Sequence, residues 1–179
     1  MRQLLFLIGL CILCTCSATA QDVQGVYSES HPAEVGVGYT FFRFYEVPST
    51  TPNFNGITFS GAYYMRKWVA ADAEVTDSFR TQAGQNSQLL FAGGGVRFCY
   101  PASRALRLWV HGLAGHSHFT PKTAYGSESA LGFEAGAGID LRYRHSPFAL
   151  RLSADMVGTR FFGTTQYSPK ATVGVVYRF

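Results

Sequence analysis

The side chains best suited to covalent or metal chemistry are serines and histidines in the second half of the chain. They are His111, His116, Ser117, His118, Ser127 and Ser129. A serine hydroxyl beside a histidine could act as a nucleophile, and His116 with His118 could bind a metal ion. Their spacing matches no defined nucleophile motif, however, and serine is common in loops. We therefore predict no catalytic residue, no bound metal and no other cofactor.

A second group of reactive side chains consists of acids and arginines spaced among glycines. The group comprises Asp72, Glu74, Arg97, Arg107, Glu134, Asp140, Arg142, Arg151 and Asp155. Paired carboxylates could perform acid–base chemistry, and a charged passage could conduct ions. Five acids and four bases are also nearly balanced, as a closed interior requires, because an unpaired buried charge is costly. We favour this structural role as a charge network.

Strands must position these side chains, because apolar residues recur at every second position. In the clearest segment, Leu131 and Phe133 alternate with Gly132 and Glu134. The sequence predicts eight such segments, at residues 34–44, 56–66, 68–76, 88–98, 105–115, 131–143, 148–156 and 171–179. Seven of them have nine to eleven residues, the length that a tilted strand needs to cross a bilayer, and 131–143 has thirteen.

The connections between these segments alternate in length. Short ones lie around Lys67 and at residues 101–104 and 144–147, whereas longer polar ones span residues 45–55, 77–87, 116–129 and 159–169. Bacterial outer-membrane barrels have short periplasmic turns and longer outward loops. We therefore predict an all-β fold, an eight-stranded antiparallel up-and-down transmembrane barrel with four outward loops and both termini in the periplasm.

A soluble β-sandwich or lipocalin-like barrel would also alternate, but with its apolar face turned inward. The charged face distinguishes the two folds, because its acids and arginines are separated by glycines. Glycine on a solvent-exposed strand face weakens the strand without improving packing. Inside a narrow barrel it leaves room for long Arg and Glu side chains, so we favour the membrane barrel.

Two contacts are predicted inside this barrel, one from turn geometry and one from the closure of the barrel. If residues 144–147 close a tight turn, Asp140 lies directly opposite Arg151, within cross-strand contact range. Glu34 and Arg178 both point inward where the first and last strands meet.

The chain begins with a targeting segment. Arg2, an apolar run from Leu4 to Cys14 and the Ala18-Thr19-Ala20 site indicate a secretory signal peptide at residues 1–20. A lipoprotein signal with Cys16 acylated is the alternative. We expect a short periplasmic segment at residues 21–33 and the barrel domain at residues 34–179. Cys99 then remains without a disulfide partner, as a passive residue.

The last strand carries the most specific signal in the chain. Val173, Val175, Tyr177 and the terminal Phe179 alternate with Gly174, Val176 and Arg178. This ending resembles the assembly signal of outer-membrane barrels. With the eightfold alternation, the chain resembles the small eight-stranded family that contains the OmpA transmembrane domain, OmpX and opacity-type surface proteins. Because the chain stops at Phe179, we expect no peptidoglycan-binding domain.

The resemblance implies a non-enzymatic structural or surface-interaction role in envelope integrity or adhesion, in the outer membrane of a Gram-negative bacterium. The expected partners are outer-membrane lipid and lipopolysaccharide, the barrel-assembly machinery and an extracellular ligand bound by the loops. A net charge of +4 is scattered and does not indicate nucleic-acid binding. The alternatives are a lipid-modifying outer-membrane enzyme and a narrow ion pore. The aromatic residues Phe119, Tyr125, Phe161, Phe162 and Tyr167 could contact a ligand or form an outer aromatic girdle. We favour the girdle.

Overall fold

The computed structural model describes residues 32–44, 53–82, 85–120, 126–143, 146–161 and 163–179. The chain divides into two units, and the second, His31–Phe179, holds all of these residues. The predicted signal peptide and most of the predicted segment 21–33 lie outside the described residues. Among the residues described, no helix has the length and apolar character needed to cross a membrane.

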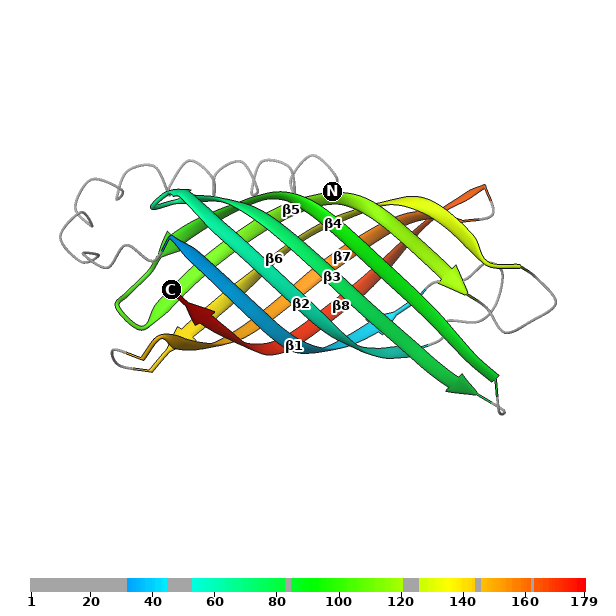
Figure 1. The fold of residues 1–179 in the computed structure, drawn as a ribbon, viewed down its shortest axis with the longest axis horizontal. Coiled ribbons are helices and arrows are strands. Elements are labelled where there is room, and N and C mark those ends of the chain that lie inside the picture. Colours follow the sequence, from blue (N-terminus) through cyan, green and yellow to red (C-terminus); the bar gives the residue numbers. More distant parts are fainter. Residues whose placement is uncertain (1–31, 45–52, 83–84, 121–125, 144–145, 162) are drawn as a thin grey trace, which may run out of the picture. The chain divides into compact units, whose positions relative to one another are not determined.

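Eight antiparallel strands form a closed barrel, in which each strand pairs with the next and β1 pairs with β8 (Figure 1). The strands are β1 (Ala33–Arg43), β2 (Asn53–Arg66), β3 (Val69–Gln82), β4 (Gln85–Pro101), β5 (Leu106–Thr120), β6 (Glu128–Arg142), β7 (Phe148–Phe161) and β8 (Thr164–Arg178). The predicted fold class, an eight-stranded up-and-down antiparallel barrel, is confirmed.

The two ends of the barrel differ in their connections. Phe179 donates its backbone N–H to the carbonyl oxygen of Ala33 at 3.0 Å, so both strand termini lie at one end. We call this the terminal end; it also carries the turns between β2 and β3, β4 and β5, and β6 and β7. The opposite end, which we call the hairpin end, carries the connections between β1 and β2, β3 and β4, β5 and β6, and β7 and β8.

The barrel turns its apolar residues outward and its charged residues inward. Along β1, Val35, Val37 and Tyr39 are each at least half exposed, whereas Glu34 is buried. The same alternation holds on the other strands, so the outer face is apolar and the buried acids and arginines lie in the lumen. This is the inverse of a soluble barrel and agrees with the predicted orientation of the two faces.

The strands extend well beyond the predicted segments, and two of the four predicted long loops are wrong. The β3–β4 pairing continues to Gln82 and Gln85, and the β7–β8 pairing continues to Phe161 and Thr164. Only residues 83–84 and 162–163 separate the paired strands in the sequence. Gly163 adopts a left-handed conformation, with φ of 74°, which suits such a turn.

Residues 116–129, predicted as the third long loop, are half strand, because 116–120 belong to β5 and 128–129 belong to β6. Phe119 on β5 pairs with Glu128 on β6. Threonine is common in strands, and Ser117 and Phe119 of this stretch are buried in the lumen, so a polar stretch in this chain does not mark the end of a strand. In the first long connection, β2 already begins at Asn53, and residues 45–52 lie outside the described residues.

Candidate functional site

The lumen near the terminal end holds a group of ion pairs that we call the arginine cluster, formed by Glu34, Asp140, Arg97, Arg107, Arg151 and Arg178. Glu34 Oε1 accepts hydrogen bonds from Arg97 and Arg151, both at 2.6 Å, and its other oxygen accepts one from Arg107. The Tyr64 hydroxyl also donates to Glu34, at 2.9 Å. One carboxylate from β1 thus links side chains from β2, β4, β5 and β7.

Asp140 on β6 is the second acid of the arginine cluster. It pairs with Arg151 in the β6–β7 register and accepts its Nε–H at 2.8 Å, as the turn geometry predicts. Arg107 and Arg178 donate to the same carboxylate at 2.6 and 3.0 Å. The indole of Trp109 donates to it at 3.1 Å, while Arg97 and Arg151 stack on the Trp109 ring. Glu34 and Arg178 also pair directly in the β1–β8 register.

Farther from the terminal end lies a second group, the lysine cluster, formed by Asp72, Glu74, His111, Glu134, Asp155 and Lys170. Lys170 Nζ donates to Glu134 at 2.5 Å and to Glu74. Arg97 reaches across from the arginine cluster and donates to Asp72 from two nitrogens, at 2.8 and 3.0 Å. The two clusters therefore form one continuous network.

His111 occupies the centre of the lysine cluster. Its Nδ1 lies 2.9 Å from Asp72 and its Nε2 lies 3.1 Å from Asp155. Ionised carboxylates only accept hydrogen bonds, so both contacts are satisfied only when the ring or one carboxyl group carries an additional proton. With an imidazolium, the six acids of the two clusters would face six cations.

Three side chains of the lysine cluster could in principle hold a metal ion. The potential ligand atoms of His111, Glu134 and Asp155 lie within 4.8 Å of one another, and all three residues are buried. The ammonium of Lys170, however, lies 2.5 Å from Glu134 and 3.8 Å from Asp155. Because this ammonium supplies a cation to the same carboxylates, the geometry gives no reason to add a metal ion.

From the lysine cluster toward the hairpin end, the lumen is lined first by threonine hydroxyl groups and then by apolar side chains. Thr40 contacts Thr58 at 2.5 Å and Thr172 at 2.9 Å, and Thr76 extends the row to Glu74. Beyond these threonines lies an apolar group that we call the phenylalanine plug. It consists of Phe42, Phe44, Phe54, Leu89, Phe119, Val157 and Phe161, all buried.

The phenylalanine plug overturns part of the predicted outer girdle. Phe119 and Phe161 are only 4% and 0% exposed, and their ring centroids lie 5.9 Å apart inside the barrel. They occupy inward positions because β5 and β7 extend to these residues with unbroken alternation. Tyr167 does face outward, whereas Tyr125 and Phe162 lie outside the described residues.

Eight of the nine residues predicted as the charge network lie in the two clusters. They are Asp72, Glu74, Arg97, Arg107, Glu134, Asp140, Arg151 and Asp155. The ninth, Arg142, lies half-buried at the terminal end of β6, where its Nε donates to the carbonyl oxygen of Ser146 at 3.0 Å.

The prediction missed Lys170 and did not count His111. Lys170 adjoins the stretch that composition assigns to a loop. It nevertheless lies an even number of residues from Thr172, Val176 and Arg178 on the same strand, which all face the lumen. Extending the strand alternation across Pro169 predicts that Lys170 faces the lumen. The proline fits because β1 pairs with β8 only as far as Lys170, so Pro169 lacks a neighbour on that side.

The serines and histidines considered for chemistry are strand residues, apart from Ser127 at the edge of β6. Ser117 is buried and faces the lumen, whereas His116 faces outward. His118 Nδ1 lies 2.7 Å from the Ser129 hydroxyl on the outer face. In the described part of the chain no acidic side chain holds the other nitrogen of His118, so the pair lacks the orienting group of a catalytic triad.

Cys99 is buried and free of a disulfide. Its sulfur lies 3.8 Å from the Tyr64 hydroxyl, beside the arginine cluster. This enclosed position agrees with the passive role expected from the sequence.

The residues predicted as an assembly signal lie on the outer face of β8. Val173, Val175, Tyr177 and Phe179 are all at least 37% exposed. The Tyr177 ring packs edge-on against Phe148 and Phe179. Their role in assembly stays a prediction.

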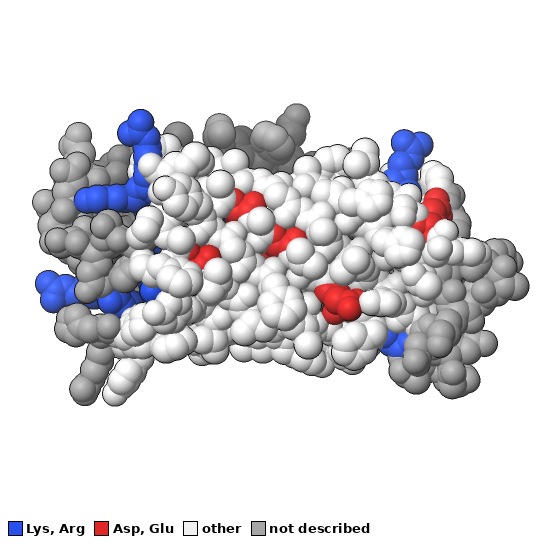
Figure 2. All heavy atoms as spheres, viewed as in Figure 1, with Lys and Arg blue, Asp and Glu red and all other residues white. Residues whose placement is uncertain are grey.

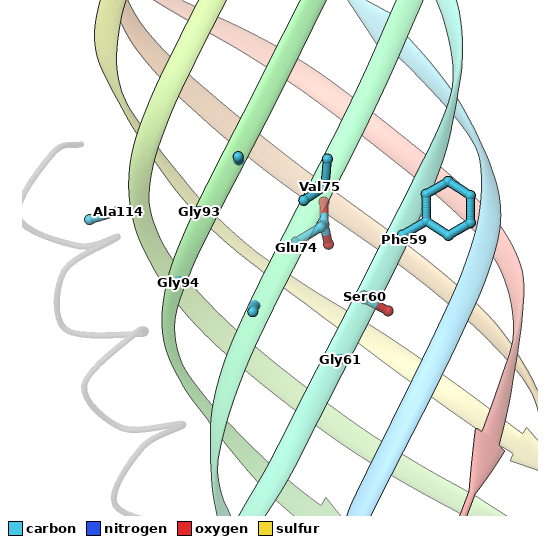
Figure 3. A pocket seen from close by; sticks show the side chains of 10 residues that line it. Phe59, Ser60, Gly61, Glu74, Val75, Gly93, Gly94 and Ala114 are labelled. Carbon is cyan, nitrogen blue, oxygen red and sulfur yellow. The ribbon is translucent and has the colours of Figure 1, made fainter.

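A shallow hollow crosses the outer face over β2 to β5 (Figure 3). Its floor is a row of small residues paired across four strands: Gly61, Ala73, Gly94 and Ala114. Glu74 lies beneath it but is buried in the lysine cluster. The hollow thus offers small apolar side chains and backbone to its surroundings.

No family model and no curated protein matches the chain. Solved structures do match. Neisserial surface protein A is 10% identical with a TM-score of 0.70, and the match covers 83% of this chain and 97% of that one. Ail, the attachment invasion locus protein of Yersinia pestis, is 17% identical with a TM-score of 0.59, over 82% and 97%. The N-terminal β-barrel domain of Pseudomonas aeruginosa OprF is 16% identical with a TM-score of 0.54, over the same shares.

The strand number, antiparallel order and closure of this chain agree with these similarities. The protein has the fold of the small eight-stranded outer-membrane β-barrels.

Proposed function

We propose that the protein is an integral outer-membrane barrel that acts at the cell surface without enzymatic chemistry. The observation that carries this proposal is the inverted distribution of side chains. Large apolar residues such as Phe59, Leu131 and Phe133 are 58–69% exposed on the outer face, whereas the acids and arginines of the two clusters are enclosed. Water would make this outer face unfavourable, whereas bilayer hydrocarbon suits it.

Heat-modifiable gel mobility of the membrane fraction tests insertion. A folded outer-membrane barrel resists detergent until it is boiled, so boiled and unboiled samples should migrate differently. Identical mobility, together with recovery in the soluble fraction, would contradict the proposal.

The filled lumen supports a non-conducting barrel. Ion pairs span the arginine and lysine clusters, and the aromatic rings of the phenylalanine plug lie 5.4–6.5 Å from their neighbours. Eight strands leave an interior just wide enough for side chains to fill. Planar-bilayer recordings of purified protein should therefore give a flat baseline, and stable unitary currents would instead establish the pore.

A role at the surface is supported by the similar folds, one of which is named a surface protein and another an attachment invasion locus protein. We assign the hairpin end to the cell exterior, because it carries the longer connections, at residues 44–52 and 121–127.

Adhesion of a non-adherent bacterial strain that expresses the protein tests this role. Cultured epithelial cells should retain these bacteria more than bacteria with an empty vector. Replacing residues 45–52 and 121–125 with Gly and Ser should remove the difference, whereas the same replacement at residues 102–105, at the terminal end, should not. Equal retention with and without the protein would contradict an adhesive role.

A lipid-modifying enzyme remains the second candidate, favoured by the hydrogen bond between His118 and Ser129 on the outer face. Mass spectrometry of lipid A from cells with and without the protein, and labelling with a fluorophosphonate, test it. We expect unchanged lipid and no label. A label lost in Ser129→Ala would establish the enzyme instead.

A further inference from the structure

The turns at the terminal end carry exposed cations. Arg66 and Lys67 lie at the β2–β3 turn and Arg104 lies in the β4–β5 turn, and all three are exposed. The described acids nearest to this end, Glu34 and Asp140, are 2% and 0% exposed and are neutralised within the arginine cluster. In Figure 2, Lys and Arg side chains accordingly project from the end that carries the C terminus in Figure 1.

A ring of aromatic side chains lies directly beside these cations. It consists of Tyr63, Trp68, Phe98, Tyr100, Tyr143, Phe148, Tyr177 and Phe179, all on the outer face at the terminal end. Aromatic belts of this kind lie at the level of lipid headgroups. Trp68, which is 56% exposed, directly follows Lys67 and stacks on Phe98.

The turns are too short to carry the cations away from this level. β2 ends at Arg66 and β3 begins at Val69, while β4 and β5 are joined by residues 102–105. The Ser103 hydroxyl accepts the backbone N–H groups of Ala105 and Leu106, which folds the second turn back on the strands. Flexible cationic side chains next to an aromatic belt can reach phosphates in the adjoining leaflet.

We propose that Arg66, Lys67 and Arg104 form a binding surface for the phosphate groups of anionic phospholipids in the periplasmic leaflet. The inference rests on the proposed membrane insertion. The hairpin end does not offer the same surface, because Asp77 and Glu128 lie there among the arginines. A peptidoglycan strand also carries acidic groups, but it lies beyond the membrane, whereas these side chains are held beside the aromatic belt.

The two tryptophans make the surface measurable. Trp68 faces lipid, whereas Trp109 is 4% exposed inside the arginine cluster. Lipids with brominated acyl chains quench tryptophan on contact, so they report mainly on the surroundings of Trp68. In vesicles that mix phosphatidylcholine and phosphatidylglycerol, with one or the other brominated, the quenching gives the relative association constant of the two lipids beside Lys67.

We expect phosphatidylglycerol to be favoured by about fivefold or more, the factor expected of one basic side chain at an anionic surface. The preference should fall to near one in Arg66→Gln/Lys67→Gln/Arg104→Gln and at high salt. The matched control, Arg43→Gln/Arg160→Gln, changes exposed arginines at the hairpin end and should retain the preference. Heat-modifiable mobility confirms that each variant is folded.

A preference near one in the wild type, or one that the triple variant retains, would overturn this inference while strong quenching still supports insertion. Absence of quenching by either brominated lipid would instead overturn insertion itself. The wild type could instead show no lipid preference but sediment with purified peptidoglycan, while the triple variant does not sediment. This result would identify peptidoglycan, and not the lipid, as the ligand of these cations.

Discussion

Replacing Glu34 with glutamine isolates the contribution of the arginine cluster to stability. The substitution preserves the shape of the side chain and removes its charge. In the wild type, four arginines lie within 3.6 Å of the Glu34 carboxylate. After Glu34→Gln, Asp140 would be the remaining acid of this cluster, paired with Arg107, Arg151 and Arg178. Arg97 would keep its contact with Asp72.

The expected loss of stability follows from burial and from the number of partners. Removing one partner of a buried ion pair costs about 3–5 kcal/mol, because the other partner is left uncompensated. Glutamine keeps one carbonyl oxygen as an acceptor, so we expect about 3 kcal/mol, or on the order of 100-fold in the folding equilibrium. Arg107 is the cation best able to recover solvation, since its side chain is 16% exposed whereas that of Arg97 is 1% exposed.

Urea unfolding in phospholipid vesicles, monitored by tryptophan fluorescence and gel mobility, measures this loss. Asp77→Asn is a matched control, because it makes the same chemical change at a half-exposed carboxylate that accepts a hydrogen bond from Gln88. We expect the control to cost less than about 1 kcal/mol. The double variant Glu34→Gln/Arg107→Gln should cost less than the sum of the single variants, by about 1 kcal/mol or more.

Two outcomes would refute this reasoning. A cost for Glu34→Gln no larger than that of Asp77→Asn would mean that the carboxylate is not essential to a closed network. Strict additivity in the double variant would mean that Glu34 and Arg107 do not interact, despite their contact.

Three further predictions concern the plug, the glycines and the C terminus. Phe161→Ala should lower the free energy of unfolding by about 3–5 kcal/mol, while Tyr167→Ala, at a side chain 65% exposed, should cost far less; equal losses in vesicle unfolding would contradict the inward packing. Gly138→Ala should cost about 1–3 kcal/mol of stability and shift indole fluorescence, because a Cβ there would lie 2.2 Å from the Trp109 ring. The control is Gly112→Ala, whose Cβ would meet nothing within 4 Å. Identical spectra of the two variants would argue against the contact between Gly138 and Trp109. Deleting Phe179 should reduce the amount of protein in the outer membrane, and normal levels in membrane fractions would argue against its role in assembly.

The sequence was sufficient for the architecture because the bilayer and the lumen impose opposite demands on alternate residues. Val37 and Gly38, for example, lie on opposite faces of one strand, and a shift of one residue would exchange them. The same alternation fixed the pairing of Asp140 with Arg151, since turn length determines register. It could not fix the strand ends, because strands that leave the membrane keep their hydrogen bonds but lose the apolar signal.

The site was predictable where charges lie within the apolar alternation and not where they lie beyond it. Arg97 and Glu134 are each flanked by apolar residues that face outward, which shows that the charged side chains face the lumen. Lys170 follows Pro169 in a polar stretch, so the face of the strand on which it lies can be assigned only after the strand has been extended. The phenylalanine plug was missed for the same reason, because an aromatic residue outside the apolar belt can cover the lumen or face the solvent equally well.

The filled interior restricts where this protein can act. The arginine cluster and lysine cluster neutralise each other's charges, and the phenylalanine plug covers them, so chemistry and transport through the lumen would require the network to be broken. Recognition then falls to the two ends, which differ in charge. On the proposals above, the exposed side chains of Arg66, Lys67 and Arg104 at the terminal end would contact a lipid leaflet, and the hairpin end would make the contacts outside the cell. The two sets of variants, at opposite ends of one stable barrel, should therefore impair lipid preference and adhesion independently of each other.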